Sequence, residues 1–353
     1  MSPTGTGIPK LGISLAYWPW FTYAQQVEMA VLADDLGLDG VWVSEAWGQD
    51  TVSMLGALSV LTENVRLGTA IMQVPARPAT SAAMAIASLD VMSKGRLTIG
   101  IGPSGPQVSE GWYGEPFGKP LKRTREYVAT LRQALAGENV PVQVSEDAEG
   151  VSGLGKPLRL LVRPERTSVP IYLGASAPGG LKQCATIGDG WIGFLVDPER
   201  PGPLLDPLRS ALADAGRADD ETFETCCIVP TSVAPTLDEA REAVRPWIAF
   251  YLGAMGAKGK NFYVDLVDAY GYGAAAEEIQ DRWLGGDQAA AAAAIPTELL
   301  DAVTIAATPD TLQERLARFS AGGIDTLLCT PCGDLTGTVR ALGRARHAGA
   351  AEG

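Results

Sequence analysis

Short apolar runs alternate along the chain with longer segments in which apolar residues recur at helical spacing. Eight runs have the pattern of buried strands: residues 11–17, 38–45, 65–74, 96–102, 169–176, 189–196, 225–233 and 324–330. Near-continuous apolar strands between amphipathic helices predict a parallel sheet with both faces covered. Eight strand-helix units predict an α/β fold of the (β/α)8 TIM barrel type, because an open doubly wound sheet usually has fewer units.

Capping residues mark the ends of several predicted helices. In the first helix, within residues 21–37, Thr22 and Gln25 have the spacing of a capping box, and Gly37 fits the position after the last turn. In residues 308–323, Thr308 is predicted as the N-cap, with Pro309 as the first helical residue.

Two segments interrupt the alternation. Residues 138–168 lack helical periodicity, and residues 253–297 are rich in glycine and alanine. Each is either a flexible surface connection or a lid over the mouth of the barrel, and the pattern does not separate the two. Apart from these insertions, residues 1–353 are predicted to form one barrel domain.

Composition and charge narrow the classes of partner. Hydrophobic residues make up 46% of the 353 residues, enough for a large core, yet no apolar run has the length of a membrane-spanning helix. The first ten residues have no apolar leader, so we expect a soluble, cytoplasmic protein. The formal net charge of −13 disfavours nucleic acid and anionic membranes as partners.

Histidine and cysteine restrict the chemistry further. His347 is the only histidine, which argues against His-dependent nucleophilic catalysis and against zinc or iron sites held by histidine. Cys329 and Cys332 form a C-x-x-C motif, but two further zinc ligands are missing, so two small residues at a strand end are the favoured interpretation. We therefore predict no metal site, and chemistry carried by a cofactor or by carboxylates and tyrosines.

The stretch from Gly100 to Gly105 matches G-x-G-x-x-G, the dinucleotide fingerprint. Pro103 and Pro106 interrupt it, and no helix is expected before about residue 119, so the dinucleotide interpretation is rejected. We expect instead that these glycines let the backbone approach a flat ligand.

Two other strand ends could hold ligand groups. In "GASAPGG" a strand ends, small residues turn, and a helix begins near Pro178; the N–H groups at its start suit an anion, although a plain turn explains the pattern equally well. Glu45 ends another apolar strand and could bind a heterocycle or transfer protons, or simply form a cap or salt bridge. The basic residues Lys119, Lys122, Arg123 and Arg125 are interpreted as a solvated helix face.

The segments "GVWVSEAWGQD", "VRLGTAIMQVPARPA", "GIGPSGPQVSEGWYGEPFGKPLKRTREYV" and "PIYLGASAPGG" together resemble the luciferase-like monooxygenase superfamily. The similarity is greatest to its branch of coenzyme F420-dependent (deazaflavin) oxidoreductases, which includes methylenetetrahydromethanopterin reductase. It extends from the first strand to about residue 195 and resumes over 304–335. Residues 196–300 are not diagnostic.

This resemblance implies that coenzyme F420 binds at the carboxyl ends of the strands, with a non-prolyl cis peptide at Ala70-Ile71 behind its ring. The residues expected to contact the cofactor are Glu45, Ala70, Ile71, Gln73, Gly102, Ser104, Gly105, Gly174, Ala175, Ser176, Gly179 and Gly180. The substrate pocket is expected to include Tyr17, Trp18, Trp47 and Trp112. The family resemblance also suggests a homodimer.

Departures from the family pattern bear on the reaction. Sugar-phosphate dehydrogenases of the branch have a histidine where this chain has Ala46, and a catalytic glutamate where it has Pro103 to Pro106. We therefore expect reduction of an activated C=C or C=N bond of a small molecule, a natural-product precursor or a modified peptide, with the proton supplied by Glu45, Tyr113, Glu110 or water. An FMN-dependent monooxygenase is the alternative, and a barrel without a cofactor is a third hypothesis.

Overall fold

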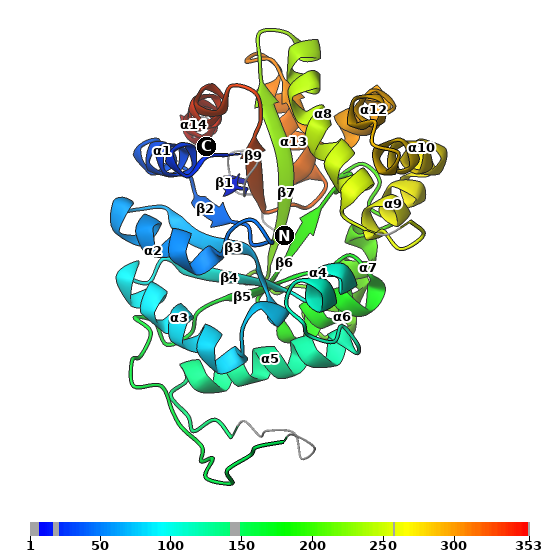
Figure 1. Ribbon diagram of the computed structural model, residues 1–353. Helices are drawn as coiled ribbons and strands as arrows, with labels where there is room; N and C mark the ends of the chain where they lie inside the picture. Colours follow the sequence, from blue (N-terminus) through cyan, green and yellow to red (C-terminus); the bar gives the residue numbers. More distant parts are fainter. Residues whose placement is uncertain (1–6, 17–20, 142–148, 257, 352–353) are drawn as a thin grey trace.

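The strands form a closed parallel barrel (Figure 1). The computed structural model describes residues 7–16, 21–141, 149–256 and 258–351. The strands are β1 Lys10–Leu15, β2 Gly40–Val43, β3 Arg66–Gln73, β4 Leu97–Gly102, β5 Ile171–Gly174, β6 Gly190–Phe194, β7 Glu224–Val233, β8 Ile305–Ala307 and β9 Thr326–Pro331. They are ordered β6-β5-β4-β3-β2-β1-β9-β7, and pairing of β6 with β7 closes the ring. The predicted TIM barrel is thus confirmed, with the short β8 added beside the end of β7.

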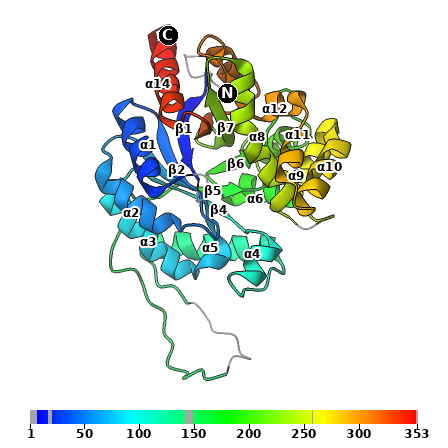
Figure 2. The same ribbon diagram turned by 45° about the horizontal axis from the view of Figure 1, so that its top comes forward.

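Helices surround the barrel in both views (Figures 1 and 2). The α-helices are α1 Tyr23–Asp35, α2 Thr51–Leu61, α3 Ala79–Met92, α4 Pro106–Gly111, α5 Pro120–Leu135, α6 Pro178–Ile187, α7 Leu205–Asp214, α8 Leu237–Ala254, α9 Phe262–Val267, α10 Gly273–Leu284, α11 Gln288–Ala293, α12 Thr297–Val303, α13 Leu312–Ala321 and α14 Leu335–Ala351. The 3-10 turn η1 Val74–Ala76 and the π-turn η2 Asp268–Tyr272 complete the set. No helix in the described ranges is long and apolar enough to cross a bilayer.

The predicted start of the first helix is confirmed, whereas that of α13 is wrong by one turn. The Gln25 N–H donates to Thr22 Oγ1 at 3.2 Å, and the Thr22 N–H donates to Gln25 Oε1 at 2.9 Å. Gly37 has φ +65°, as its position requires. Helix α13 begins at Leu312 because the Thr311 hydroxyl accepts from the Thr308 N–H at 3.0 Å and holds residues 308–311 in a turn.

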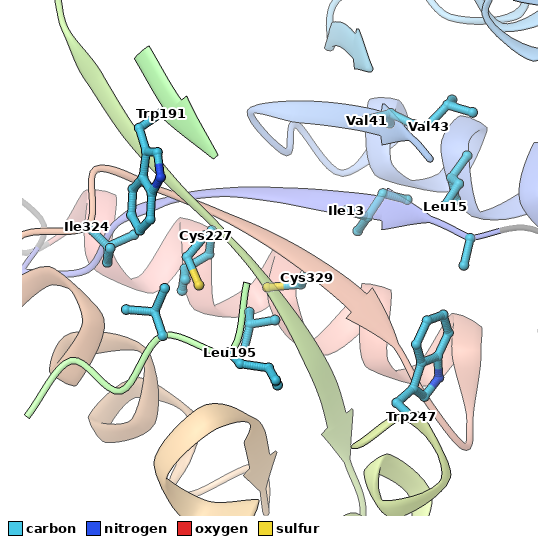
Figure 3. Close-up of a cluster of buried hydrophobic side chains, with 14 of the residues drawn as sticks. Ile13, Leu15, Val41, Val43, Trp191, Leu195, Cys227, Trp247, Ile324 and Cys329 are labelled. Carbon is cyan, nitrogen blue, oxygen red and sulfur yellow. The ribbon is translucent and has the colours of Figure 1, made fainter. Parts of the chain in front are cut away.

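Outward-facing strand residues form the main core with the helices (Figure 3). Trp191, Cys227, Ile324 and Cys329 belong to this cluster and are at most 2% exposed. A smaller cluster fills the barrel interior around Trp42, which is fully buried. A Cβ at Gly68 would lie well inside 3.0 Å of the Trp42 ring, so the indole occupies space that a side chain would otherwise take.

A buried ionic network, here called the barrel floor, lies at the amino-terminal ends of the strands. Glu224 receives two bonds from Arg66, Nη1 to Oε2 at 2.5 Å and Nη2 to Oε1 at 3.0 Å. The hydroxyls of Tyr172 and Thr326 also donate to it, and Lys10 Nζ lies 3.6 Å away. Burial raises the pKa of Glu224, but the hydrogen bonds and charge of Arg66 outweigh burial and hold that pKa at about 2.

The two segments that interrupt the sequence pattern lie in different places. The described part of residues 138–168 extends away from the barrel beneath α3 and α5 (Figures 1 and 2). Arg166 ties it to Asp90, near the end of α3, at 2.6 Å, at the amino-terminal end of the barrel. This position favours a surface connection over a lid. Residues 253–297 are largely helical and pack α10 and α11 against α8.

Candidate active site

A cavity of about 1030 Å³ lies at the carboxyl ends of the barrel strands. Its lining includes residues within or just beyond the end of each of the eight barrel strands, together with residues of α4, α5, α6, α8 and α9. Barrel enzymes place their active sites at this end. The cavity is therefore the candidate active site.

The Glu45 carboxylate is already bonded within the protein. Its side chain is 1% exposed, and Arg77 Nη2 lies 2.5 Å from Oε1. The backbone N–H of Gln73 donates to Oε2 at 2.8 Å, and that of Thr51 to Oε1 at 3.3 Å. The salt bridge expected as a simple alternative for Glu45 is therefore present in buried form. Glu45 is not the helix cap, because Asp50 caps α2 and Glu45 accepts from only the first N–H of that helix.

Arg77 was not recognised in the sequence. It follows η1, and although burial lowers its pKa, the hydrogen bond and charge of Glu45 outweigh burial and raise that pKa overall. The signal was an arginine in "PARPA", between two prolines directly after a strand end. Arginine at such a place pairs readily with a carboxylate on a neighbouring strand.

Strand β3 bulges where it borders the cavity. The Ala70-Ile71 peptide is cis, as the family resemblance implied, and the register with β4 shifts between Thr69 and Met72. The Ser44 hydroxyl donates to the Ala70 carbonyl at 3.0 Å. The peptide and the side chain of Ile71 both belong to the cavity wall.

The glycines of β4 make room for this bulge. A Cβ at Gly100 would lie well inside 3.0 Å of the Thr69 carbonyl, and one at Gly102 equally close to Ile71 Cδ1. A Cβ at Gly174 would be 3.2 Å from Ile71 Cγ2. Gly105 lines the cavity as expected, whereas Gly102 does not line it and makes room for Ile71.

A second correction concerns the segment after these glycines. Helix α4 begins at Pro106, directly after Gly105, although no helix was expected before about residue 119. Proline suits the first helical position, where its missing N–H costs nothing. Ser104 and Gly105 line the cavity, and the Ser104 hydroxyl donates to Gln73 Oε1 at 3.3 Å.

The turn from β5 to α6 presents backbone to the cavity. The lining residues in this turn are Gly174, Ala175, Ser176, Ala177, Gly179 and Gly180. The N–H of Gly180 was expected to be available to an anion, but it donates to the Ala177 carbonyl at 2.9 Å. The N–H groups of Ser176 and Gly179 have no acceptor within the described part of the chain, and no side chain caps the helix.

The other predicted residues are divided between the cavity and the surface. Trp47 and Trp112 line the cavity. Glu110 is exposed, does not line it, and accepts from the Phe117 N–H at 3.1 Å. Tyr113 is half-buried outside the lining, and burial, followed by the charge of Glu45, raises its pKa. Tyr17 and Trp18 lie outside the described residues.

A group of aromatic side chains that the sequence analysis did not recognise, here called the aromatic wall, lines another side of the cavity. It consists of Phe194 from β6, Trp247 and Tyr251 from α8, and Phe262 and Tyr263 from α9. The ring centroids of Phe194 and Tyr251 lie 4.4 Å apart, and those of Tyr251 and Tyr263 lie 5.1 Å apart. Trp247 and Tyr251 are four residues apart, so their shared helix face was the available signal.

Charge and metal ligands are sparse around the cavity. Among the lining residues that the structure describes, Glu45 is the one with a charged side chain. The described residues contain no cluster of three metal-ligating side chains. The five cysteines are free and buried, and burial raises the pKa of the Cys329 thiol to about 12, which disfavours a reactive thiolate.

Known proteins are similar to this chain in sequence and in fold. The sequence model described as luciferase-like monooxygenase matches residues 4–326. A Mycobacterium tuberculosis protein named as a coenzyme F420-dependent oxidoreductase is 37% identical over 91% of this chain and 94% of its own length. The 5,10-methylenetetrahydromethanopterin reductase of Archaeoglobus fulgidus is 29% identical over 95% of this chain and 98% of its own.

Solved structures agree in fold. The coenzyme F420-dependent tetrahydromethanopterin reductase of Methanopyrus kandleri superposes with a TM-score of 0.79 at 22% identity. The superposition covers 96% of this chain and 98% of the other.

Proposed function

Because the chain belongs to the luciferase-like monooxygenase family, we propose that it is a coenzyme F420-dependent oxidoreductase that works as a reductase. The observation that carries the proposal is the cavity side built from the β3 bulge and the β5–α6 turn, which offers a peptide surface and unpaired N–H groups together. The names of the relatives support F420 over FMN. When bound in its reduced form, coenzyme F420 supplies a hydride.

The residues present suit a flat ring that carries an anionic tail. The ring would lie against Ala70 and Ile71, and the phosphate would accept from the N–H groups of Ser176 and Gly179 at the start of α6. Gln73 and Ser104 add polar atoms to the same lining, at the ends of β3 and β4.

Glu45 is proposed to act as a positioning residue. Its carboxylate holds the backbone of Gln73 and the guanidinium of Arg77, so it fixes the end of β3 where the ring would lie. Because these bonds occupy the carboxylate, and because Tyr113 and Glu110 do not line the cavity, we propose that water supplies the proton.

The hydride acceptor is proposed to be an activated C=C or C=N bond of a natural-product or modified-peptide precursor. Two observations support reduction over sugar-phosphate oxidation. Ala46 and the Pro103-to-Pro106 segment lack the groups that such oxidation uses in the family. In addition, no cationic side chain among the described lining residues could hold a sugar phosphate.

A homodimer is also proposed, with α2 and α3 at its interface. These helices contact each other and expose large apolar side chains: Val60, Leu61, Met84, Val91 and Met92. Exposed apolar patches of this kind mark association surfaces. Size-exclusion chromatography with light scattering is expected to show a dimer for the parent and a monomer for Met84→Asp; a parent monomer would refute this proposal.

Fluorescence titration with coenzyme F420 and with FMN tests the cofactor. We expect F420 to bind in the micromolar range and inorganic phosphate to compete with it. The same deazaflavin without its phosphate should bind more weakly and show no competition by phosphate. Preference for FMN would favour the oxygenase alternative, and failure to bind either cofactor would favour a barrel without a cofactor.

A further inference from the structure

We infer that the substrate of this site is uncharged and binds a flat apolar group, such as a ring, against the aromatic wall of Phe194, Trp247, Tyr251, Phe262 and Tyr263. The inference rests on the proposed function for the statement that the cavity holds a cofactor and a substrate together. It goes further because it names the chemical class of the substrate and the surface that selects it.

The wall lies across the cavity from the β3 bulge and borders the β5–α6 turn, because Phe194 ends β6, which pairs with β5. Strands β3, β4 and β5 are neighbours in the barrel, and α8 follows β7 in the chain. Around the ring, two strands separate β7 from β4 in one direction and four strands separate them in the other. Figure 2 shows α8 and α9 together on the side away from α2 and α3. A substrate between the two sides therefore meets peptide and cofactor on one face and aromatic rings on the other.

The rings of the wall support one another. Tyr263 meets Phe194 at an interplanar angle of 83° and Tyr251 at 82°, so edges contact faces. Trp247 stacks on Tyr251 at 17°. Such a fixed apolar surface binds flat apolar groups at little entropic cost, because rings have few torsions to lose.

The absence of usable charge in the described lining excludes ionic substrates. Apart from the N–H groups of Ser176 and Gly179, which the proposed cofactor would occupy, an anion would find no lysine, arginine or histidine in the described lining. A cation would find only the Glu45 carboxylate, which Arg77 already neutralises. Moving an unpaired charge from water to such a surface is unfavourable. An uncharged group loses little hydration there and gains the contact with the rings.

A matched series of three probes tests this inference by calorimetry. The probes are 1-naphthalenemethanol, 1-naphthoate and 1-naphthylmethylammonium, which share a ring system and differ in charge. We expect the alcohol to bind at least tenfold more tightly than either ion, with or without coenzyme F420 present. Equal or tighter binding of an ion, or no binding of any probe at millimolar concentration, would overturn the inference.

A charge introduced into the wall should change this preference. Phe262 is 52% exposed, so Phe262→Lys is compatible with folding, and it should improve naphthoate binding about tenfold relative to the alcohol. Leu161→Lys, at a 95% exposed position on the far end of the molecule, is the matched control and should leave all three constants unchanged. Identical constants for the parent and Phe262→Lys would show that the wall is not the substrate surface.

These experiments can refute the proposed function and the inferred substrate class independently of each other. A protein that binds the naphthalene alcohol but not coenzyme F420 would refute the proposed function and leave the preference of the wall in place. A protein that binds F420 yet treats the three probes alike would refute the substrate class alone.

Discussion

At the scale of single residues, the ion pair of Glu45 and Arg77 should dominate the stability of the cavity. Arg77→Met removes the cation and leaves a carboxylate that is 1% exposed without its charge partner. Removing one partner of a buried pair costs about 3–5 kcal/mol. We expect a loss of that size in the free energy of unfolding, measured with urea.

The double variant separates pairing from other effects. Glu45→Gln combined with Arg77→Met should cost less than the sum of the two single changes, by about 1–3 kcal/mol, because no buried charge is left unpaired. Arg209→Met breaks an exposed pair with Asp206 and serves as the control, with an expected change below about 1 kcal/mol. Additive single changes would contradict the pairing.

The glycines of β4 lead to a second residue-scale prediction. Gly100→Ala would press a Cβ against the Thr69 carbonyl, which is backbone and cannot turn away. We expect the free energy of unfolding to fall by about 1–3 kcal/mol and F420 to bind more weakly. Gly105→Ala, whose Cβ would be 3.8 Å from the nearest atom, should leave the midpoint of thermal unfolding within a few degrees. Equal losses of stability in Gly100→Ala and Gly105→Ala would refute the packing role of Gly100.

Sequence reasoning worked for residues at strand ends and failed for their partners. Glu45 and the β5–α6 glycines line the cavity as expected, because a strand end in a barrel points to one edge. Arg77 was not recognised, and neither was the packing of the β4 glycines around Ile71, because these contacts join β3 to β2, β4 and β5, which are separate in the chain. The pairing of these strands side by side in the sheet brings those atoms together.

At the scale of elements, the packing of α8 against α10 supports the aromatic wall. A Cβ at Gly253 would lie well inside 3.0 Å of the Trp283 side chain. Gly253→Ala should therefore push the helices apart, lower the free energy of unfolding by about 1–3 kcal/mol, and weaken binding of 1-naphthalenemethanol. Urea unfolding and calorimetry measure the two effects.

Gly56 provides the matched control for this substitution. It also lies inside a helix, α2, but a Cβ there would meet no atom within 4 Å. Gly56→Ala should raise stability by about 0.5–1 kcal/mol, because alanine has the higher helix propensity. A gain of stability in both variants would show that helix propensity, and not packing, governs Gly253.

Strong periodicity predicted the strands and main helices of the barrel, whereas short or weakly periodic helices were not recognised in the sequence. The eight barrel strands and their main helices followed from the alternation of apolar and amphipathic segments. Helices α10 and α11 were missed because runs of alanine and glycine show no apolar stripe, although alanine itself favours helix. Helices α9 and α12 have only six and seven residues. Helix α4 has six residues, too few for a period to show.

At the scale of the whole molecule, the barrel floor makes stability depend on pH. The pKa of Glu224 is lowered from 4.5 to about 2 in the folded protein. A lowered carboxylate pKa adds stability above the unfolded value and loses it as the pH falls towards the folded value. The contribution is on the order of 3 kcal/mol, lost between pH 4.5 and about 2.

Urea unfolding across that range measures the effect. Glu224→Gln should be less stable than the parent at pH 7, because Arg66 loses its partner, and the difference should shrink as the pH falls below 4.5. Glu199→Gln, which affects a carboxylate that is 66% exposed in its pair with Arg318, should differ little from the parent at any pH. If the difference in unfolding free energy between the parent and Glu224→Gln stayed constant down to pH 3, the lowered pKa of Glu224 would be contradicted.

The same floor governs how ligands exchange with the solvent. Trp42 and the network of Arg66 and Glu224 fill the amino-terminal end of the barrel, while the cavity occupies the other end. We therefore expect a cofactor and a substrate bound in the cavity to exchange with the solvent through the carboxyl-terminal end of the barrel.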